Sequence, residues 1–168
     1  MTRSAPASVP TAWRLAIGVG CRAGRPAEAI EAAIAAALAR LGALHGREAA
    51  SHAQVACVAT LDAKAGEPGL VACCERHGWP LRAIARETLL AMTPAPGGHD
   101  AREAHEAPGH DAGTRADTAG ARRPSAVQAR FGVDGVCEPC ALAAAPQGRL
   151  LVPKTVVDGV TVAIAGPA

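Results

Sequence analysis

The feature that most constrains the fold is the stretch Trp13–Gly24, where an apolar run stops at a glycine-rich turn before an alanine-rich helical segment. The run Trp13–Val19 predicts a buried strand. Pro26 is predicted as the first helical residue, because the N–H that proline lacks would be unpaired there. When a strand, a glycine turn and a helix follow one another in this order, the backbone N–H groups at the start of the helix can bind an anion. The turn, which holds Arg22, is therefore the first candidate site for a negatively charged ligand.

Apolar and polar segments alternate along the rest of the chain and predict further strands and helices. The predicted strands are Trp13–Val19, Gln54–Leu61, Pro80–Ala85, Arg149–Val152 and Val160–Ala165. The predicted helical segments are 26–42, Pro68–His77, Glu87–Met92, Ser125–Phe131 and Cys137–Ala145, and residues 43–53 are predicted as a polar connection. Glycines at positions 42 and 78 are expected to end the first two helices.

The connection between the last two predicted strands, Pro153–Gly159, is too short for a crossover helix. These strands should therefore pair antiparallel, whereas the earlier strands alternate with helices, as in parallel sheets. The sequence predicts an α/β fold, a three-layer α/β/α arrangement with a mixed, mostly parallel sheet of about five strands. We expect a single domain over residues 1–168.

Two segments lack the composition of a packed core. Residues 1–11 are rich in Ser, Pro and Ala and are predicted to be a frayed tail. Residues 93–124 contain hardly any apolar anchor, so they are predicted to be a disordered insertion. Three histidines of that insertion, His99, His105 and His110, are irregularly spaced, which favours adventitious or no metal binding over a built site.

Charge and apolar content exclude several classes of protein. The net charge is only +2 and there is no long basic block, which argues against a nucleic-acid partner. No apolar run is long enough to span a bilayer, and the run before Cys21 is too short for a good signal peptide. The six cysteines are interpreted as reduced thiols. We therefore expect a cytoplasmic protein.

The glycine turn matches a dinucleotide-binding pattern only loosely, as Gly18-x-Gly20-x-x-Ala23. The acid expected about twenty residues on is missing, since Asp62 comes much later. Arg22 within the turn also departs from the pattern. A tight turn that needs glycine only for its conformation is the plain alternative. A nucleotide-binding enzyme stays open as a further hypothesis.

Charged residues also follow the second predicted strand. Asp62, Lys64 and Glu67 would be close enough to share protons or to clamp a ligand. The alternative is a solvated turn with Glu67 at a helix start. The pair Cys137 and Cys140 forms a CxxC, but no second ligand pair accompanies it, so buried thiols are favoured over a zinc or redox site.

Taken together, several segments resemble the CobE family of cobalamin biosynthesis, which is also the C-terminal domain of CbiG. They are Gly18–Gly24, Ala59–Leu70, Gly132–Glu138, Leu150–Lys154 and Thr161–Ala165, and their order and spacing cover nearly the whole chain outside the tail and the insertion. The resemblance implies an α/β domain in corrin-ring construction. Fused CbiG proteins are linked to opening a lactone ring of a cobalt-precorrin with loss of acetaldehyde. Pro139 and Cys140 depart from the small residues usual there, which makes the CxxC incidental to this chain.

The chemistry of a corrin intermediate suits the cations of this chain. Such a ligand carries carboxylates around a flat apolar ring, and carboxylates bind arginine forks, ammonium groups and helix N-termini. Arg22, Lys64 and Lys154 each lie at or just past the end of a predicted strand, where ligands of open α/β sheets collect. For Lys154 this placement depends on the direction of the strand before it, which the sequence does not establish.

These considerations define a set of candidate site residues. The candidate substrate-binding residues are Gly18, Gly20, Cys21, Arg22, Gly24, Thr60, Lys64 and Lys154, and the candidate acid–base residues are Asp62, Glu67 and Glu138. No metal site or cofactor is expected. The expected partner is a precorrin-type tetrapyrrole and, in addition, other enzymes of the cobalamin pathway. A non-catalytic carrier or partner module of a pathway enzyme is the alternative to a catalyst.

Overall fold

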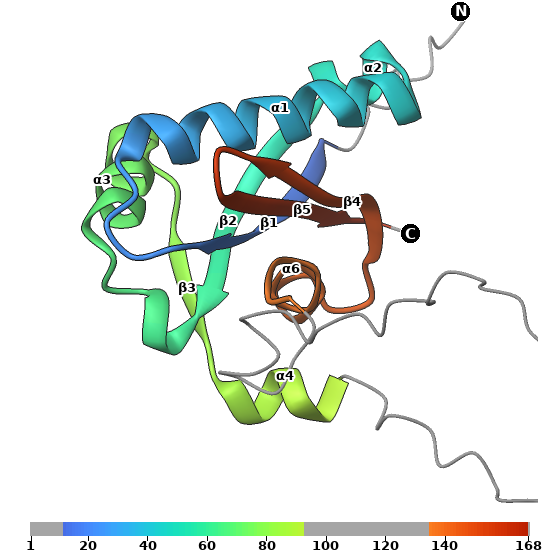
Figure 1. Cartoon of the computed structure of the whole chain (residues 1–168). Helices are drawn as coiled ribbons and strands as arrows, with labels where there is room; N and C mark the ends of the chain where they lie inside the picture. The colour runs from blue at the N-terminus through green and yellow to red at the C-terminus, as the bar shows by residue number, and fades with distance from the viewer. Residues whose placement is uncertain (1–11, 93–134, 168) are drawn as a thin grey trace, which may run out of the picture.

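The fold is built on one five-stranded sheet (Figure 1). The computed structural model describes residues 12–92 and 135–167. The strands are β1 (Trp13–Cys21), β2 (Ala53–Leu61), β3 (Leu81–Ile84), β4 (Arg149–Val157) and β5 (Val160–Gly166), in the spatial order β3-β2-β1-β5-β4. The pairs β1–β2 and β2–β3 are parallel, whereas β5 is antiparallel to both β1 and β4. The sheet is therefore mixed as predicted, and the expectation of mostly parallel pairing is met only in part.

Helices cover both faces of the sheet and confirm the three-layer prediction. They are α1 (Ala27–His45), α2 (Arg47–Ser51), α3 (Pro68–His77), α4 (Arg86–Met92) and α6 (Cys137–Ala144), with a short 3-10 turn η1 (Asp62–Lys64). Helices α1 and α3 pack together with the sheet in one apolar cluster, and α4 and α6 share a second cluster on the opposite face (Figure 1). The carboxyl ends of β1, β2, β3 and β4 lie at the same edge of the sheet, because only β5 runs in the opposite direction.

The two faces of β1 carry side chains of different size. Leu15, Ile17 and Val19 are fully buried in the cluster under α1. On the other face lie Ala16 and Gly18, and a Cβ at position 18 would overlap the carbonyl oxygen of Cys137. This smooth face lets α6 approach the backbone of β1 closely, and it fixes where the first turn of α6 lies.

Several predicted bounds are confirmed. Helix α3 has the predicted range Pro68–His77, and Gly78 ends it in the left-handed conformation with φ 66°. Helix α6 ends one residue earlier than predicted, and the last two strands form the expected antiparallel hairpin.

All six cysteines are free thiols. Among the described residues, no helix has the length and apolarity that crossing a membrane requires.

The predicted ends of the first strand and the first helix are wrong. Strand β1 continues past Val19 to Cys21, because it goes on pairing with β5 through Gly20 and Cys21, so Gly20 lies in the strand and not in the turn. Helix α1 passes through Gly42 and ends at His45, where Gly46 takes a φ of 90°. The predicted polar connection after it contains the short helix α2.

The predicted end of the fourth strand is also wrong. Strand β4 continues past Pro153 to Val157, because proline is tolerated on an edge strand and the pairing shifts register between Val152 and Thr155. Asp158 and Gly159, with φ 46° and 73°, then form a two-residue hairpin turn. The predicted frayed tail, the insertion 93–124 with its three histidines, and the predicted helix Ser125–Phe131 lie outside the described residues.

Candidate functional site

A pocket of about 320 Å³ opens at the carboxyl edge of the sheet, beside the first turn of α6. We name it the cationic pocket, and its lining residues are Gly20, Cys21, Arg22, Leu61, Lys64, Gly135, Val136, Lys154, Val156, Gly159 and Thr161. The backbone pairing of β1 with β2 stops at Gly18 and Ala59, so the two strands are no longer paired through their backbones where they reach the pocket. Such a strand end is the usual place for a ligand in an open α/β sheet.

Three basic side chains, from three different elements, line this pocket. Arg22 directly follows β1, and Lys64 lies in η1, directly after β2. Lys154 lies within β4, where Pro153 and Lys154 fall between the paired residues Val152 and Thr155. The expectation that Lys154 ends its strand is therefore wrong, but β4 runs in the same direction as β1, so Lys154 still lies toward the shared carboxyl edge.

Lys64 is held by an acid of the same chain. Its Nζ donates to Oε1 of Glu67 at 3.0 Å, with both side chains less than one-fifth exposed. The other oxygen of Glu67, Oε2, accepts the backbone N–H of Gly24 at 3.2 Å. The hydrogen bond from Lys64 and then that from Gly24 lower the pKa of Glu67. The turn after β1 thus already binds an anion, and that anion is the carboxylate of Glu67.

Arg22 and Lys154 differ from Lys64, because neither side chain forms a hydrogen bond or ion pair with the residues that the structure describes. Nζ of Lys154 would lie 3.7 Å from a Cβ at Gly135, which places this ammonium beside the start of α6. The backbone N–H of Lys154 donates to Oε1 of Glu138 at 2.8 Å, which ties β4 to the first turn of α6. Two cations are therefore free to bind an anionic ligand, near the positive end of a helix dipole.

The remaining wall of the pocket is largely apolar. Leu61 and Val136 are buried, and Val156 is exposed at 61 %. Cys21 is half-buried, and burial, followed by the nearby charge of Glu67, raises the pKa of its thiol. Thr161 donates from Oγ1 to the carbonyl of Gly20 at 3.1 Å. An apolar wall with a basic rim suits an amphipathic ligand with several negative charges.

Other predicted site residues lie outside the lining of the pocket. Thr60 is fully buried, and its Oγ1 donates to the carbonyl of Val19 at 2.8 Å, which links β2 to β1. Gly18 lies under α6. Asp62 accepts the N–H of Ala63 through Oδ1 at 2.6 Å and is exposed. The predicted residues that do line the pocket are Gly20, Cys21, Arg22, Lys64 and Lys154.

The candidate residues predicted from the sequence do not include the apolar wall of the pocket. The sequence predicts a connection at Val156, and it does not single out Leu61 or Val136 as site residues. The signal for Val156 was present, since Thr155–Val157 is a β-branched run followed by Asp158-Gly159, a strong hairpin signal. That signal extends β4 past Lys154 and so brings Val156 to the pocket.

The CxxC pair lies in the protein interior, behind the cationic pocket. Cys137 is 1 % exposed and Cys140 is fully buried, and burial raises the pKa of Cys140 to about 12. Burial also raises the pKa of Cys137. No group of three or more metal-ligating side chains occurs among residues 12–92 and 135–167. Both thiols therefore pack as small apolar groups in the layer between α6 and the sheet.

The chain is a three-layer α/β domain with a cationic, apolar-walled pocket at its strand ends, the place where ligands of open α/β sheets commonly bind. It belongs to the family described as Cobalamin synthesis G C-terminus, whose model matches residues 15–109 and 113–165. This match confirms the resemblance to the CobE family and the C-terminal domain of CbiG. No curated protein sequence matches the chain.

Solved structures from cobalamin biosynthesis have the same fold. The crystal structure of CobE, a protein from the cobalamin biosynthetic pathway, is similar with a TM-score of 0.63 and 26 % identity, covering 97 % of this chain and 95 % of that one. The cobalamin biosynthesis protein chiG from Agrobacterium tumefaciens is similar with a TM-score of 0.56 and 28 % identity, over 92 % and 98 % of the two chains. A putative cobalamin biosynthesis protein G homolog from Sulfolobus solfataricus shares the fold at 16 % identity and a TM-score of 0.53, and the match covers 37 % of its length.

Proposed function

We propose that this protein acts in cobalamin biosynthesis by binding the carboxylate rim of a precorrin-type tetrapyrrole in the cationic pocket. The observation that carries the proposal is the meeting of Arg22 and Lys154, both free of partners among the described residues, on one pocket of a cobalamin-synthesis family member. A guanidinium binds a carboxylate through two parallel N–H···O bonds, and an ammonium adds a point charge.

The size and polarity of the pocket favour binding of one edge of the ring system. A volume of about 320 Å³ lies at the lower end of ligand sites, so the pocket takes side arms and a ring edge, with the rest of the macrocycle outside. Leu61, Val136 and Val156 form the surface on which the apolar ring edge would lie. Lys64 contributes charge, but its ion pair with Glu67 makes it chiefly a positioning residue for the turn that holds Arg22.

The bonds of the acidic residues favour a binding role, in which the protein holds an intermediate for a pathway enzyme. Glu67 bridges Lys64 and Gly24, Glu138 holds the backbone of Lys154, and Asp62 accepts the N–H of its neighbour Ala63. Each carboxylate thus already accepts a hydrogen bond from within the chain. A lactone-opening activity is tested directly by incubating the purified protein with a cobalt-precorrin and assaying acetaldehyde, and its release would replace the carrier proposal.

The binding proposal is tested with uroporphyrin, a stable tetrapyrrole that carries acetate and propionate arms on every ring. Fluorescence titration should show that Arg22→Gln and Lys154→Gln each weaken binding about tenfold, the loss expected for one charge-assisted contact. Arg47→Gln removes an exposed arginine of α2 and is the charge-matched control. Equal affinities of all three variants and the parent would refute the site.

A parallel thermal-shift series tests the nucleotide alternative. NAD, FAD and nucleoside triphosphates are each added to the parent protein and to Arg22→Gln. The proposal expects a stabilising shift with uroporphyrin and none with the nucleotides. A thermal stabilisation by a nucleotide that is absent in Arg22→Gln would show that the pocket binds nucleotides instead.

A further inference from the structure

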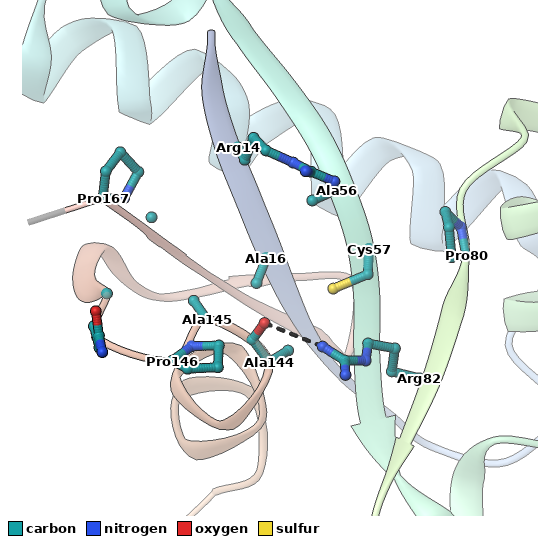
Figure 2. Close-up of a pocket in the computed structure, with 13 residues that line it drawn as sticks. Arg14, Ala16, Ala56, Cys57, Pro80, Arg82, Ala144, Ala145, Pro146 and Pro167 are labelled. Carbon is teal, nitrogen blue, oxygen red and sulfur yellow. Dashed lines mark hydrogen bonds between the residues drawn. The ribbon is translucent and has the colours of Figure 1, made fainter. Parts of the chain in front are cut away.

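A second pocket, of about 660 Å³, lies at the opposite edge of the sheet from the cationic pocket, beside the last turn of α6 (Figure 2). We name it the arginine pocket, after Arg14 of β1 and Arg82 of β3. Its floor is formed by Ala16 and Cys57, and Pro146 and Pro167 form part of its wall. The expected substrate site does not include any of these residues.

The two arginines approach the pocket from the two strands that flank β2. Figure 2 shows Arg82 reaching across β2 to α6, where its Nη1 donates to the carbonyl oxygen of Ala144 at 3.3 Å. Arg14 extends from β1 beside Ala56, and it forms no hydrogen bond or ion pair with the described part of the chain. Arg82 keeps further N–H donors free after its one bond, since a guanidinium has five.

No acidic side chain is present among the described residues that line this pocket. The last carbonyl groups of α6 carry partial negative charge there, and Arg82 already offsets that charge through its bond to Ala144. Arg14 is then a positive charge without compensation at the pocket. An anion entering the pocket therefore meets net positive charge.

The backbone of the sheet is irregular at the pocket floor. Leu15 pairs with Val55 and Ala16 pairs with Cys57, so Ala56 is an extra residue in β2, which is a β-bulge. The side chains around it are small, which keeps the floor apolar and open. Bulges are common beside ligand sites, where they redirect a strand.

From these observations we propose that the arginine pocket binds an organic anion that has a flat apolar body and one acid group. Arg14 and Arg82, which both line the pocket, would attract the acid group, and the apolar body would cover Ala16 and Cys57. A volume of about 660 Å³ is that of a site for a ligand of drug-like size. This site is separate from the cationic pocket, because α6 lies between the two, with its first turn at one and its last turn at the other.

The test uses naphthoate as the probe and naphthalene methanol as its uncharged control. Binding of each compound to the full chain is measured by two-dimensional amide NMR. Naphthoate should shift the amides of Cys57, Arg82 and Gly148 in a saturable manner, and the alcohol should bind at least about tenfold more weakly. Arg14→Gln should weaken naphthoate binding about tenfold, whereas Arg22→Gln and the control Arg47→Gln should leave it unchanged. Arg14→Gln should leave the fold intact, because the Arg14 side chain forms no hydrogen bond or ion pair with the described residues.

Three results would overturn the proposal: no saturable shift at these amides, equal affinity for the alcohol, or an unchanged affinity in Arg14→Gln. Arg82→Gln serves as a second variant and should also weaken naphthoate binding, and its folding is checked by its amide spectrum because glutamine is too short to replace the bond to Ala144. The uroporphyrin titration reports on the other pocket. Naphthoate binding that persists in Arg22→Gln while uroporphyrin binding is lost shows that the two sites are distinct.

Discussion

The carbonyl oxygen of Cys137 occupies the space that a Cβ at Gly18 would need, and the backbone nitrogen of Ala141 lies only 2.7 Å from that position. This contact between backbones sets the distance between α6 and β1. It also places the first turn of α6 beside the cationic pocket and its last turn beside the arginine pocket. The glycine that resembled part of a phosphate-binding turn thus serves helix packing.

Replacing Gly18 by alanine is expected to lower the free energy of unfolding by about 3 kcal/mol or more, because backbone atoms of α6 must move to admit the methyl group. Gly66→Ala is the matched control, since a Cβ at position 66 meets nothing within 4 Å. Urea unfolding measures both variants. Equal stability of the two would contradict the close packing of α6 on β1.

Thr60→Val is expected to lower the free energy of unfolding by about 2 kcal/mol, because it leaves the buried carbonyl of Val19 without the hydroxyl of Thr60. The affinity for uroporphyrin should stay within about twofold of the parent, since Thr60 does not line the cationic pocket. Thr60→Ser keeps the hydroxyl and serves as the control. If Thr60→Val had normal stability but no longer bound uroporphyrin, Thr60 would belong to the ligand site.

The free energy of unfolding should decrease at acidic pH, in part because Glu67 becomes protonated. Its pKa is lowered by Lys64 and Gly24, so its contribution to stability is fully present above the ordinary glutamate pKa of about 4.3 and is lost as the pH falls through the lower folded value. Glu67→Gln should therefore be less stable than the parent at neutral pH. The difference between them should shrink as the pH falls below the ordinary glutamate value of about 4.3 in urea unfolding series. A difference that does not depend on pH would contradict the ion pair with Lys64.

Cys21 should react with iodoacetamide before the other five cysteines, because it is half-buried whereas the others are each at most 5 % exposed. Burial raises the pKa of Cys21, so the rate should still be rising with pH above the ordinary cysteine pKa of about 8.5. Peptide mass spectrometry locates the label, and unfolded protein provides the control. Uroporphyrin should slow the labelling of Cys21, and labelling that it does not slow would place the ligand elsewhere.

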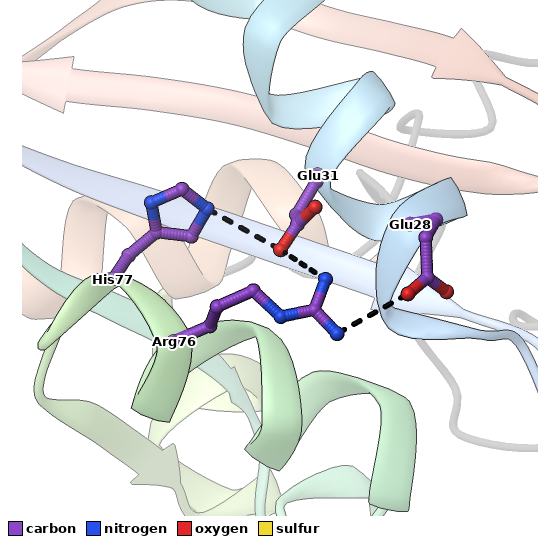
Figure 3. Close-up of polar contacts among 4 residues, drawn as sticks. All are labelled: Glu28, Glu31, Arg76 and His77. Atoms are coloured by element: carbon purple, nitrogen blue, oxygen red, sulfur yellow. Dashed lines mark hydrogen bonds and ion pairs between the residues drawn. The ribbon is translucent and has the colours of Figure 1, made fainter.

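The ion pairs between α1 and α3 should contribute little and should depend on salt. Figure 3 shows Arg76 directed at both Glu28 and Glu31, with distances of 3.2 Å and 2.9 Å, and His77 beside Glu31 at 3.3 Å. Arg76 is about half exposed, so solvent and salt screen these pairs. Arg76→Gln should lower the melting temperature slightly at low salt and hardly at all at high salt. A large drop in the melting temperature that does not depend on salt would show that Arg76 acts through packing.

The sequence alone determined the elements whose ends carry their own chemical signals. Helix α3 begins at Pro68 and ends before Gly78 as predicted, because proline at a first turn and glycine in the left-handed region act through their own backbones. The layering also followed from local patterns, since alternating strands and helices leave few arrangements that bury their apolar faces. The resemblance of its ordered segments identified the family.

The tertiary structure decided which charges are free and what each glycine does. Glu67 binds Gly24, 43 residues away in the chain, and Glu138 binds the backbone of Lys154, so neither bond follows from local sequence. The extent of β1 depends on its pairing with β5, and the requirement for Gly18 depends on a helix that begins more than a hundred residues later. Contacts of this kind depend on how distant segments come together in space. A pattern of neighbouring residues therefore locates the strand end, but only the assembled fold shows that Arg22 and Lys154 are left free beside it.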